Sequence, residues 1–452
     1  MGNQATVASR FWGFVERASK VPVGVAVALA VVLRVGAGLA ISAGTTRYYE
    51  YGAIARHIVA GKGYSYFPAL GDAVLPLTQM DEASRWLPSA YVPPVYTYVT
   101  VAATELGGGS HAGTVWALRG FNLLMACATV LAIHALARRL TGSPAAANLA
   151  ALGAAIHPPF VYVATQVSGA NLYVLVEVLL VIALLTAAYR KDWRAWVAAG
   201  ALLGLLSVLR GEAVVLIPLA AVWLLWAARR AGVDGYRRLT VLFVAVACVL
   251  PVGWMARNWS AFGRPVLAVA TTGGYNLWAG NHPGATGSQK GAVYSPELRE
   301  RLLELPPDAD FELEHDYVLR QAAVDYIREE PDQALVGVAR KAALLVVADV
   351  YDARSRNPLY IGGWLVLLAW GTLGLVGWWR SEQADRARRV LIAGLLTFSA
   401  VVPLVFVVLP RYRLPIESML LVFAGGWLAT GAARASAKAT AVSADPPVVT
   451  RG

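Results

Sequence analysis

The sequence is poor in charged residues and in cysteine. Only 15% of its 452 residues are charged, and its two cysteines, Cys127 and Cys248, lie inside separate apolar runs. Such cysteines provide neither a disulfide framework nor a thiolate metal site. The chain also lacks a Walker loop, a dinucleotide fingerprint and a His-Glu-x-x-His sequence. These absences argue against nucleotide-driven chemistry.

Long apolar runs dominate the chain instead. Hydrophobic residues make up 57% of it, and the mean hydropathy is +0.53. A membrane-spanning helix needs about 20 apolar residues. The sequence therefore predicts an all-α polytopic membrane protein with about ten spans, near 21–42, 113–136, 144–163, 171–189, 195–209, 212–228, 239–256, 359–379, 390–409 and 414–433.

The distribution of charge predicts the topology of these spans. The net charge of +11 would suit a nucleic-acid-binding protein, but the basic residues gather in the segments on one side of the predicted membrane. That side has 19 basic against 6 acidic residues, whereas segments 43–112 and 258–358 together have 14 against 19. Because cytoplasmic loops are rich in Lys and Arg, we expect both termini in the cytoplasm of a plasma-membrane protein and the two long segments outside.

We expect four regions along the chain. Residues 1–257 form a transmembrane module with the first external loop, 43–112, and residues 258–358 form a second external segment with interfacial helices. Residues 359–433 form the last spans. The tail, 434–452, is rich in Ala, Ser, Thr and Pro and is predicted to be disordered.

The first external loop contains a candidate catalytic base. Apolar residues at helical spacing predict an amphipathic helix from Glu50 to Ala60 along the membrane surface, and Pro93-Pro94 predicts the start of a second helix. Glu50 would border a lipid-facing stripe, where it is partly removed from water. A carboxylate in that position is a better base toward a nearby hydroxyl, although it could equally be an ordinary interfacial side chain.

Several charged residues fall within or at the ends of predicted spans, where charge is costly. Four of them are arginines at the external ends of predicted spans: Arg210, Arg257, Arg411 and Arg413. An arginine cluster there suits a lipid phosphate, because guanidinium groups bind phosphate in bidentate fashion. The alternative is structural pairing, such as Arg210 with Glu212 or Arg413 with Glu417. The full set is Arg34, Arg119, Glu177, Arg210, Glu212, Arg257, Arg411, Arg413 and Glu417.

The second external segment opens with a glycine-rich and asparagine-rich stretch, residues 271–287. Its glycines permit tight turns and close approach to a ligand, and Tyr275 and Trp278 offer faces on which a sugar could stack. Helical periodicity follows at 296–304 and 312–328, and residues 333–348 are typical of an interfacial helix.

Three segments together resemble the GT-C superfamily of membrane glycosyltransferases, specifically bacterial relatives of the dolichyl-phosphate-mannose protein mannosyltransferases and of the lipid A aminoarabinose transferases. The first runs from Glu50-Tyr51 through Gly61-Lys62-Gly63-Tyr64 and closes at residues 88–96. The second is Gly273-Gly274-Tyr275-Asn276-Leu277-Trp278-Ala279-Gly280-Asn281 with Ala285-Thr286-Gly287, and the third is Arg411-Tyr412-Arg413-Leu414-Pro415.

This resemblance implies an inverting transferase that moves a sugar from a polyprenyl-phosphate donor to an acceptor hydroxyl on a lipid, glycan or protein, outside the membrane. The family's first-loop aspartate, three or four residues before Tyr51, is replaced here by Arg47 or Tyr48, so the catalytic carboxylate falls to Glu50 or to the pair Asp81 and Glu82. A divalent ion, Mg or Mn, could join these carboxylates but is not required. The predicted phosphate ligands are Arg210, Arg257, Arg411 and Arg413, and the predicted substrate-binding residues are Tyr51, His57, Tyr91, Tyr275, Asn276, Trp278 and Asn281.

Two other functions compete with this one. A lipid or sugar transporter would line its path with the buried charges, but it should also show inverted repeats and broken helices, which the sequence does not display convincingly. A non-catalytic relative of the transferases is the other alternative, because the usual aspartate is missing.

Overall fold

The computed structural model describes residues 2–46, 49–66, 86–289, 293–306 and 308–444. This part of the chain is helical, and it has no β-strand beyond two isolated bridges, Ser65 with Pro88 and Ser288 with Val408. The predicted all-α architecture is confirmed.

Each predicted span is helical in the structure. Eight helices in the described residues are long and apolar enough to cross a membrane, and α6 and α9 are shorter apolar helices. The protein is therefore a multi-pass membrane protein. The helices are α2 (Val23–Ala40), α5 (His111–Thr141), α6 (Pro144–Ile156) with α7 (Pro158–Val163), α8 (Ala170–Tyr189), α9 (Trp193–Ser207), η4 (Gly211–Val215) with α10 (Leu216–Arg230), α11 (Tyr236–Phe262), α16 (Pro358–Trp379), α17 (Arg386–Val405) and α18 (Leu414–Ala444).

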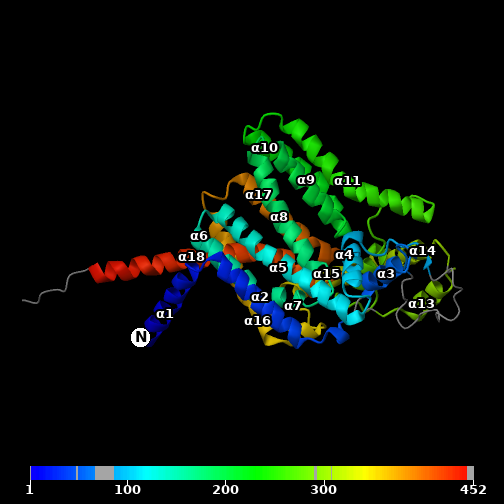
Figure 1. The fold of residues 1–452 in the computed structure, drawn as a ribbon, viewed down its shortest axis with the longest axis horizontal. Helices are drawn as coiled ribbons and strands as arrows, with labels where there is room; N and C mark the ends of the chain where they lie inside the picture. Colours follow the sequence, from blue (N-terminus) through cyan, green and yellow to red (C-terminus); the bar gives the residue numbers. More distant parts are fainter. Residues whose placement is uncertain (1, 47–48, 67–85, 290–292, 307, 445–452) are drawn as a thin grey trace, which may run out of the picture.

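Helix α18 is the centre of the bundle. It packs against α5, α6, α8, α16 and α17, and Figure 1 shows it running through the middle of these helices. Close approach depends on small residues, because a Cβ on Gly374 of α16 would overlap the carbonyl oxygen of Phe423. Glycine at such a contact lets two backbones meet without a side chain between them.

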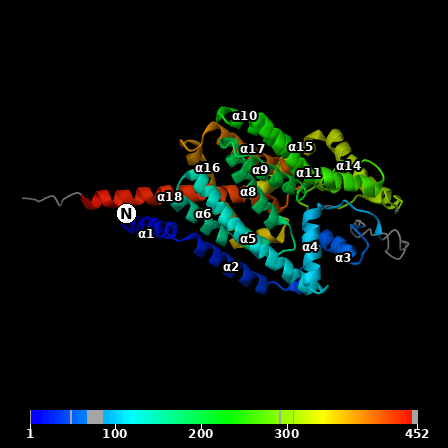
Figure 2. The ribbon, with the colours of Figure 1, turned by 45° about the horizontal axis from the view of Figure 1, so that its top comes forward.

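A second group of helices forms a cap at one end of the bundle. It comprises α3 (Tyr49–Val59), α4 (Pro94–Leu106), α12 (Gly273–Gly280), α13 (Pro296–Leu303), α14 (Phe311–Glu329) and α15 (Pro331–Val346). Helix α1 (Gly2–Ser19) and the last turns of α18 project from the opposite end (Figures 1 and 2). Pro94 begins α4 as predicted, since proline at the first helical position lacks an N–H that would have no partner there.

Two expectations are wrong, the lipid-facing stripe of α3 and the disordered tail up to Ala444, whereas for the glycine-rich stretch the sequence predicted only tight turns and close approach. The apolar stripe of α3 faces protein, not lipid, because Ile54 is fully buried against Tyr64 and Val92. The glycine-rich stretch forms α12, and Gly280 accommodates the carbonyl oxygen of Phe406. The tail is helical to Ala444, since alanine is the strongest helix former and recurs at every second position from 435 to 441.

Candidate functional site

Glu50 lies in the first turn of α3 and faces a group of tyrosine hydroxyls. Burial raises the pKa of Tyr51 to about 12, raises that of Tyr275 and raises that of Tyr91 well above its ordinary range, and in all three cases the Glu50 carboxylate raises it further. Such an interaction requires the carboxylate and the hydroxyls to lie near one another. The structure therefore brings together four residues that the sequence suggests for one site.

Two of the four predicted phosphate ligands, Arg210 and Arg411, also act on Tyr51. The guanidinium carbons of Arg210 and Arg411 are 5.0 and 5.8 Å from the centre of the Tyr412 ring, so both cations contact one aromatic side chain. Both also act on the Tyr51 hydroxyl and lower its pKa against the effects of burial and Glu50. Tyr51 is thus influenced by a carboxylate and by two guanidinium groups.

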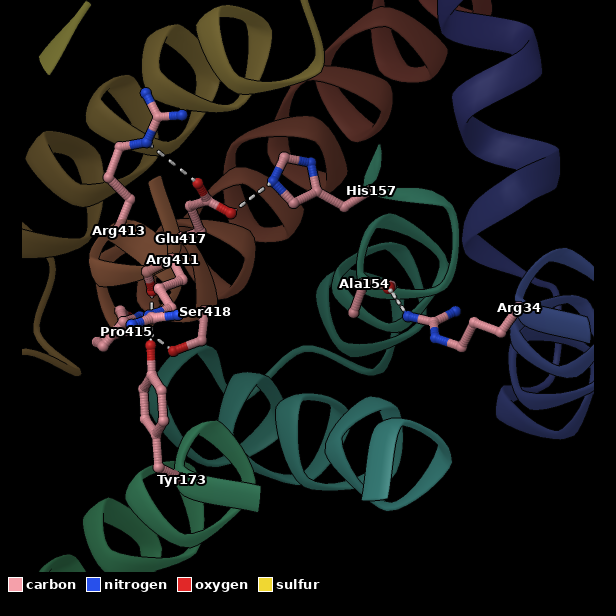
Figure 3. A network of polar contacts seen from close by, with 9 residues as sticks. All are labelled: Arg34, Ala154, His157, Tyr173, Arg411, Arg413, Pro415, Glu417 and Ser418. Atoms are coloured by element: carbon pink, nitrogen blue, oxygen red, sulfur yellow. Dashed lines mark hydrogen bonds and ion pairs between the residues drawn. The ribbon is translucent and has the colours of Figure 1, made fainter. Parts of the chain in front are cut away.

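Arg210 and Arg411 differ in whether a carboxylate of the described residues pairs with the guanidinium group. Arg210 is paired with Glu212, as the alternative of structural pairing proposes. Arg411 is exposed and has no carboxylate partner among the described residues. Its backbone oxygen accepts a 2.6 Å hydrogen bond from the Tyr173 hydroxyl, which fixes the main chain at η6 (Pro410–Arg413) and leaves the guanidinium group free to bind an anion (Figure 3).

Arg413 points away from Arg411 toward the interior of the bundle (Figure 3). It is 1% exposed, its Nε is 3.6 Å from a Glu417 oxygen, and its guanidinium carbon is 4.7 Å from the centre of the Trp364 ring. His157 contacts the other Glu417 oxygen at 3.0 Å. Arg413 therefore belongs to a buried ionic network, which does not agree with its predicted role as a phosphate ligand.

Arg257, the fourth predicted phosphate ligand, also binds protein. It donates hydrogen bonds to the backbone oxygens of Ser89, at 2.6 Å, and Tyr64, at 3.1 Å. Its guanidinium carbon is 4.9 Å from the centre of the Trp254 ring. Arg257 therefore connects α11 to the first loop. Of the four arginines predicted to bind phosphate, Arg210 and Arg411 are left as candidates.

Two predicted substrate-binding residues, Trp278 and Asn281, are occupied by protein contacts. Trp278 is 2% exposed and stacks on His282 and Tyr294, so it offers no face to a sugar. Asn281 donates to the Val405 oxygen at 3.0 Å and accepts from Lys341 at 3.0 Å.

His57 contacts the Ser65 backbone oxygen through Nδ1 at 2.8 Å and lies edge-on to Trp86. It thus helps to join α3 to the loop that follows. Asn276 is half-buried on α12, next to Tyr275 in the sequence, and its role in substrate binding stays a prediction.

Four tyrosines join the site without having been predicted. The hydroxyls of Tyr66 and Tyr294 interact with that of Tyr91, while Tyr173 and Tyr412 flank the Arg210 guanidinium group. Tyr412 lies between two arginines in the sequence, which was a usable signal. Tyr173 lies in an apolar span and gave none.

The remaining predicted carboxylates, Asp81 and Glu82, lie outside the described residues. Among the residues that the structure does describe, no group of three or more His, Cys, Asp or Glu side chains is placed to hold a metal ion. A divalent ion bound by the first loop stays a prediction.

Comparison with known proteins agrees with the expected relationship. Residues 91–255 match the family model for dolichyl-phosphate-mannose-protein mannosyltransferases. No curated protein sequence matches the chain.

The solved structures that resemble the chain include two of an oligosaccharyltransferase from Archaeoglobus fulgidus. One is AglB in complex with an inhibitory peptide and a dolichol-phosphate, with 15% identity, a TM-score of 0.53 and coverage of 94% of this chain and 51% of that chain. The other contains Zn and sulfate, with 16% identity, a TM-score of 0.52 and coverage of 93% and 51%. The chain thus spans about half the length of these proteins. ArnT from Cupriavidus metallidurans, bound to undecaprenyl phosphate, is 15% identical with a TM-score of 0.37 over 94% of this chain and 80% of that one. The resemblance to the GT-C superfamily is confirmed by the family match and by the shared fold.

Proposed function

We propose that the protein is a membrane glycosyltransferase that moves a sugar from a polyprenyl-phosphate-linked donor to an acceptor hydroxyl. The observation that carries this proposal is the combination of Glu50 with Arg210 and Arg411 around Tyr51. Transfer from a lipid phosphate needs a base for the incoming hydroxyl and fixed positive charge for the departing phosphate. The proposal assigns the first role to Glu50 and the second to Arg411 with Arg210, which all act on the Tyr51 hydroxyl.

The mechanism is a single displacement. Glu50 takes the proton of the acceptor hydroxyl, and the acceptor oxygen attacks the anomeric carbon of the sugar. The bond between that carbon and the phosphate oxygen breaks, and the lipid phosphate leaves with the electron pair. Arg411, assisted by Arg210, stabilises the negative charge that develops on the phosphate. One displacement inverts the configuration at the anomeric carbon.

The tyrosines around Glu50 suit a sugar. Tyr51, Tyr91 and Tyr275 provide hydroxyls that can donate to or accept from sugar hydroxyls, and their rings provide faces for stacking. Burial disfavours ionisation of these hydroxyls, so each keeps its proton and remains a hydrogen-bond donor. They replace Trp278 and Asn281 as the residues that we expect to contact the sugar.

The known proteins support the class of donor. The matching family is named for dolichyl-phosphate-mannose, and the similar archaeal oligosaccharyltransferase was solved with a dolichol-phosphate and a peptide. A polyprenyl phosphate is the corresponding carrier for this chain, and a lipid, glycan or protein hydroxyl is the acceptor. No step of the displacement requires a metal, although Mg or Mn bound to first-loop carboxylates would add positive charge near the phosphate.

The proposed orientation places this chemistry outside the plasma membrane. The cap carries the site, and the segments that form it are those with excess acidic residues in the sequence. Both termini would then lie in the cytoplasm.

The test is transfer of radiolabelled sugar from polyprenyl-phosphate donors by membranes that contain the protein. We expect Glu50→Gln to lower turnover by about 10² to 10⁴ and to leave donor binding nearly unchanged, because a base acts in the transition state. The matched control is Glu105→Gln, which changes an exposed carboxylate at the end of α4 and should keep normal turnover. Normal turnover in Glu50→Gln would refute Glu50 as the base and direct attention to Asp81 and Glu82.

A further inference from the structure

A buried carboxylate on α14 joins two separate segments of the cap. Glu312 is 4% exposed. Its Oε2 accepts a hydrogen bond from the Ser89 hydroxyl at 2.6 Å, and its Oε1 accepts from the Ala90 N–H at 2.8 Å and the Thr271 hydroxyl at 2.6 Å. Residues 89 and 90 belong to the end of the first loop, whereas Thr271 precedes α12. One side chain thus holds two segments that are 181 residues apart in the sequence.

The same two segments also contact each other directly. The Thr271 N–H donates to the Ala90 carbonyl oxygen at 3.0 Å, and the Ser89 hydroxyl oxygen accepts from the Tyr91 N–H at 3.0 Å. Arg257 holds the Ser89 carbonyl from the α11 side. The main chain before Tyr91 is therefore fixed from α11, from α14 and from the segment before α12.

The ionised form of Glu312 is disfavoured in this position, because burial removes its carboxylate from water. Burial raises its pKa to about 7, opposed by the hydrogen bonds from Ser89, Thr271 and Ala90 and by the nearby charge of Arg257. Burial raises the pKa of the Tyr64 hydroxyl, and the Glu312 carboxylate raises it further. An apolar side chain would avoid the desolvation of a carboxylate, but it would leave three buried donors without an acceptor.

The held segments are those that bring tyrosines to Glu50. Tyr91 follows Ala90 directly, and Tyr275 lies on α12, four residues after Thr271. The hydroxyls of both tyrosines interact with the Glu50 carboxylate. A shift of either segment would therefore change the arrangement of the candidate site without removing any group from it.

We propose that Glu312 is a positioning residue: its carboxylate clamps residues 89–90 to Thr271 and so places Tyr91 and Tyr275 beside Glu50 for sugar transfer. This inference rests on the proposed transferase function for its catalytic consequence. The hydrogen bonds of Glu312 within the cap can be measured without an assay of sugar transfer.

The clamp is tested by hydrogen exchange in the purified full-length protein. Glu312→Met removes the acceptor for the Ala90 N–H, so we expect that amide to exchange about tenfold faster or more, as the loss of a buried hydrogen bond implies. Glu312→Gln should keep slow exchange, because its amide oxygen can accept from Ala90 and Thr271 while its NH₂ group donates to the Ser89 oxygen. The control is Glu314→Met, which removes a half-buried partner of Arg264 on the same helix.

The catalytic consequence is tested by steady-state kinetics on the same variants. Small displacements in an active site reduce turnover more than binding, so Glu312→Met should lower kcat by roughly tenfold to a hundredfold and change the KM for the donor by less than about threefold. Glu312→Gln should restore most of kcat. A merely structural residue would change the yield of folded protein without this separation of kcat from KM.

The outcomes separate the two proposals. Unchanged Ala90 exchange in Glu312→Met overturns the clamp, and faster exchange with normal kcat overturns the positioning role. A wild-type protein that transfers no sugar overturns the transferase proposal and the catalytic half of this inference, while exchange still decides the clamp. If Glu312→Met fails to fold, Thr271→Val removes one of the three hydrogen bonds with little change of shape and is expected to show the same two effects to a smaller degree.

Discussion

Arg411 and Arg413 are two residues apart, yet the structure predicts opposite consequences for their substitution. Arg413 is 1% exposed and Glu417 is fully buried beside it. In Arg413→Ala, the Glu417 carboxylate keeps only its contact with His157. An uncompensated buried charge of this kind costs about 3 to 5 kcal/mol, so we expect a marked loss of stability.

Arg411 should behave differently, because its guanidinium group is exposed and has no carboxylate partner in the described part of the chain. Arg411→Ala removes no structural ion pair, so the free energy of unfolding should change by less than about 0.5 kcal/mol. Loss of a charge-assisted contact to the donor phosphate should weaken donor binding by about 1.5 to 3 kcal/mol, roughly tenfold to more than a hundredfold. Arg356→Ala, at another exposed arginine, is the control.

The assay pairs thermal unfolding in detergent with binding of a polyprenyl phosphate. Arg413→Ala should unfold at a lower temperature, and the double variant Arg413→Met with Glu417→Met should regain most of the loss, because both charges are then absent. The assignment is refuted if Arg411→Ala binds the lipid phosphate with normal affinity. It is also refuted if Arg413→Ala is stable and loses binding.

Two further predictions concern the topology and the pH dependence of the cap. A membrane-impermeant maleimide should label Lys62→Cys in intact cells and Glu382→Cys only after permeabilisation, since both positions are exposed and lie at opposite ends of the bundle; the reverse pattern would overturn the proposed orientation. The folded-state pKa of Glu312 is about 7, above its ordinary value, so its contribution to stability is fully present below about pH 4.5 and is lost as the pH rises through 7. The melting temperature should therefore fall between pH 5 and pH 8, and Glu312→Gln should fall less; equal falls in both proteins would contradict this cause.

The sequence predicts the spans well because length and apolar composition decide them. The two shorter apolar helices, α6 and α9, also fall where the sequence predicts spans, although eight other helices of the described residues are the ones long enough to cross a membrane. The helical tail was missed because its composition was weighed for polarity and not for its alanine content. Residues 435–441 illustrate how helix propensity can outweigh the absence of an apolar face.

The candidate site was harder to predict, for geometric reasons. Arg411 and Arg413 lie in a short 3₁₀ turn, where each residue rotates the chain by about 120°, so two residues apart do not share a side. Trp278 was expected to be open to a sugar because the stretch around it is rich in glycine. Those glycines instead allow α12 to pack closely on Asp316 and Phe406, which buries Trp278.

The charges buried in the spans bear on the choice between a transferase and a transporter. A translocation path requires polar side chains that can exchange partners with a passing substrate. Arg34 instead donates to the backbone oxygens of Ala154 and Ala155, at 3.1 and 2.9 Å. Figure 3 shows the Arg34 guanidinium group ending at Ala154, with Arg411 in a separate part of the polar network.

Arg119 is bound in the same way, to the backbone oxygens of Gly38 and Ile41 at 2.8 and 2.9 Å. These carbonyls lie at the end of α2, where the last backbone oxygens of a helix lack partners within the helix. Arg34 and Arg119 therefore satisfy helix ends and line no path. Glu50 on α3 of the cap and Arg411 on η6 both act on the Tyr51 hydroxyl, and a transferase needs such a pair of charges in one place.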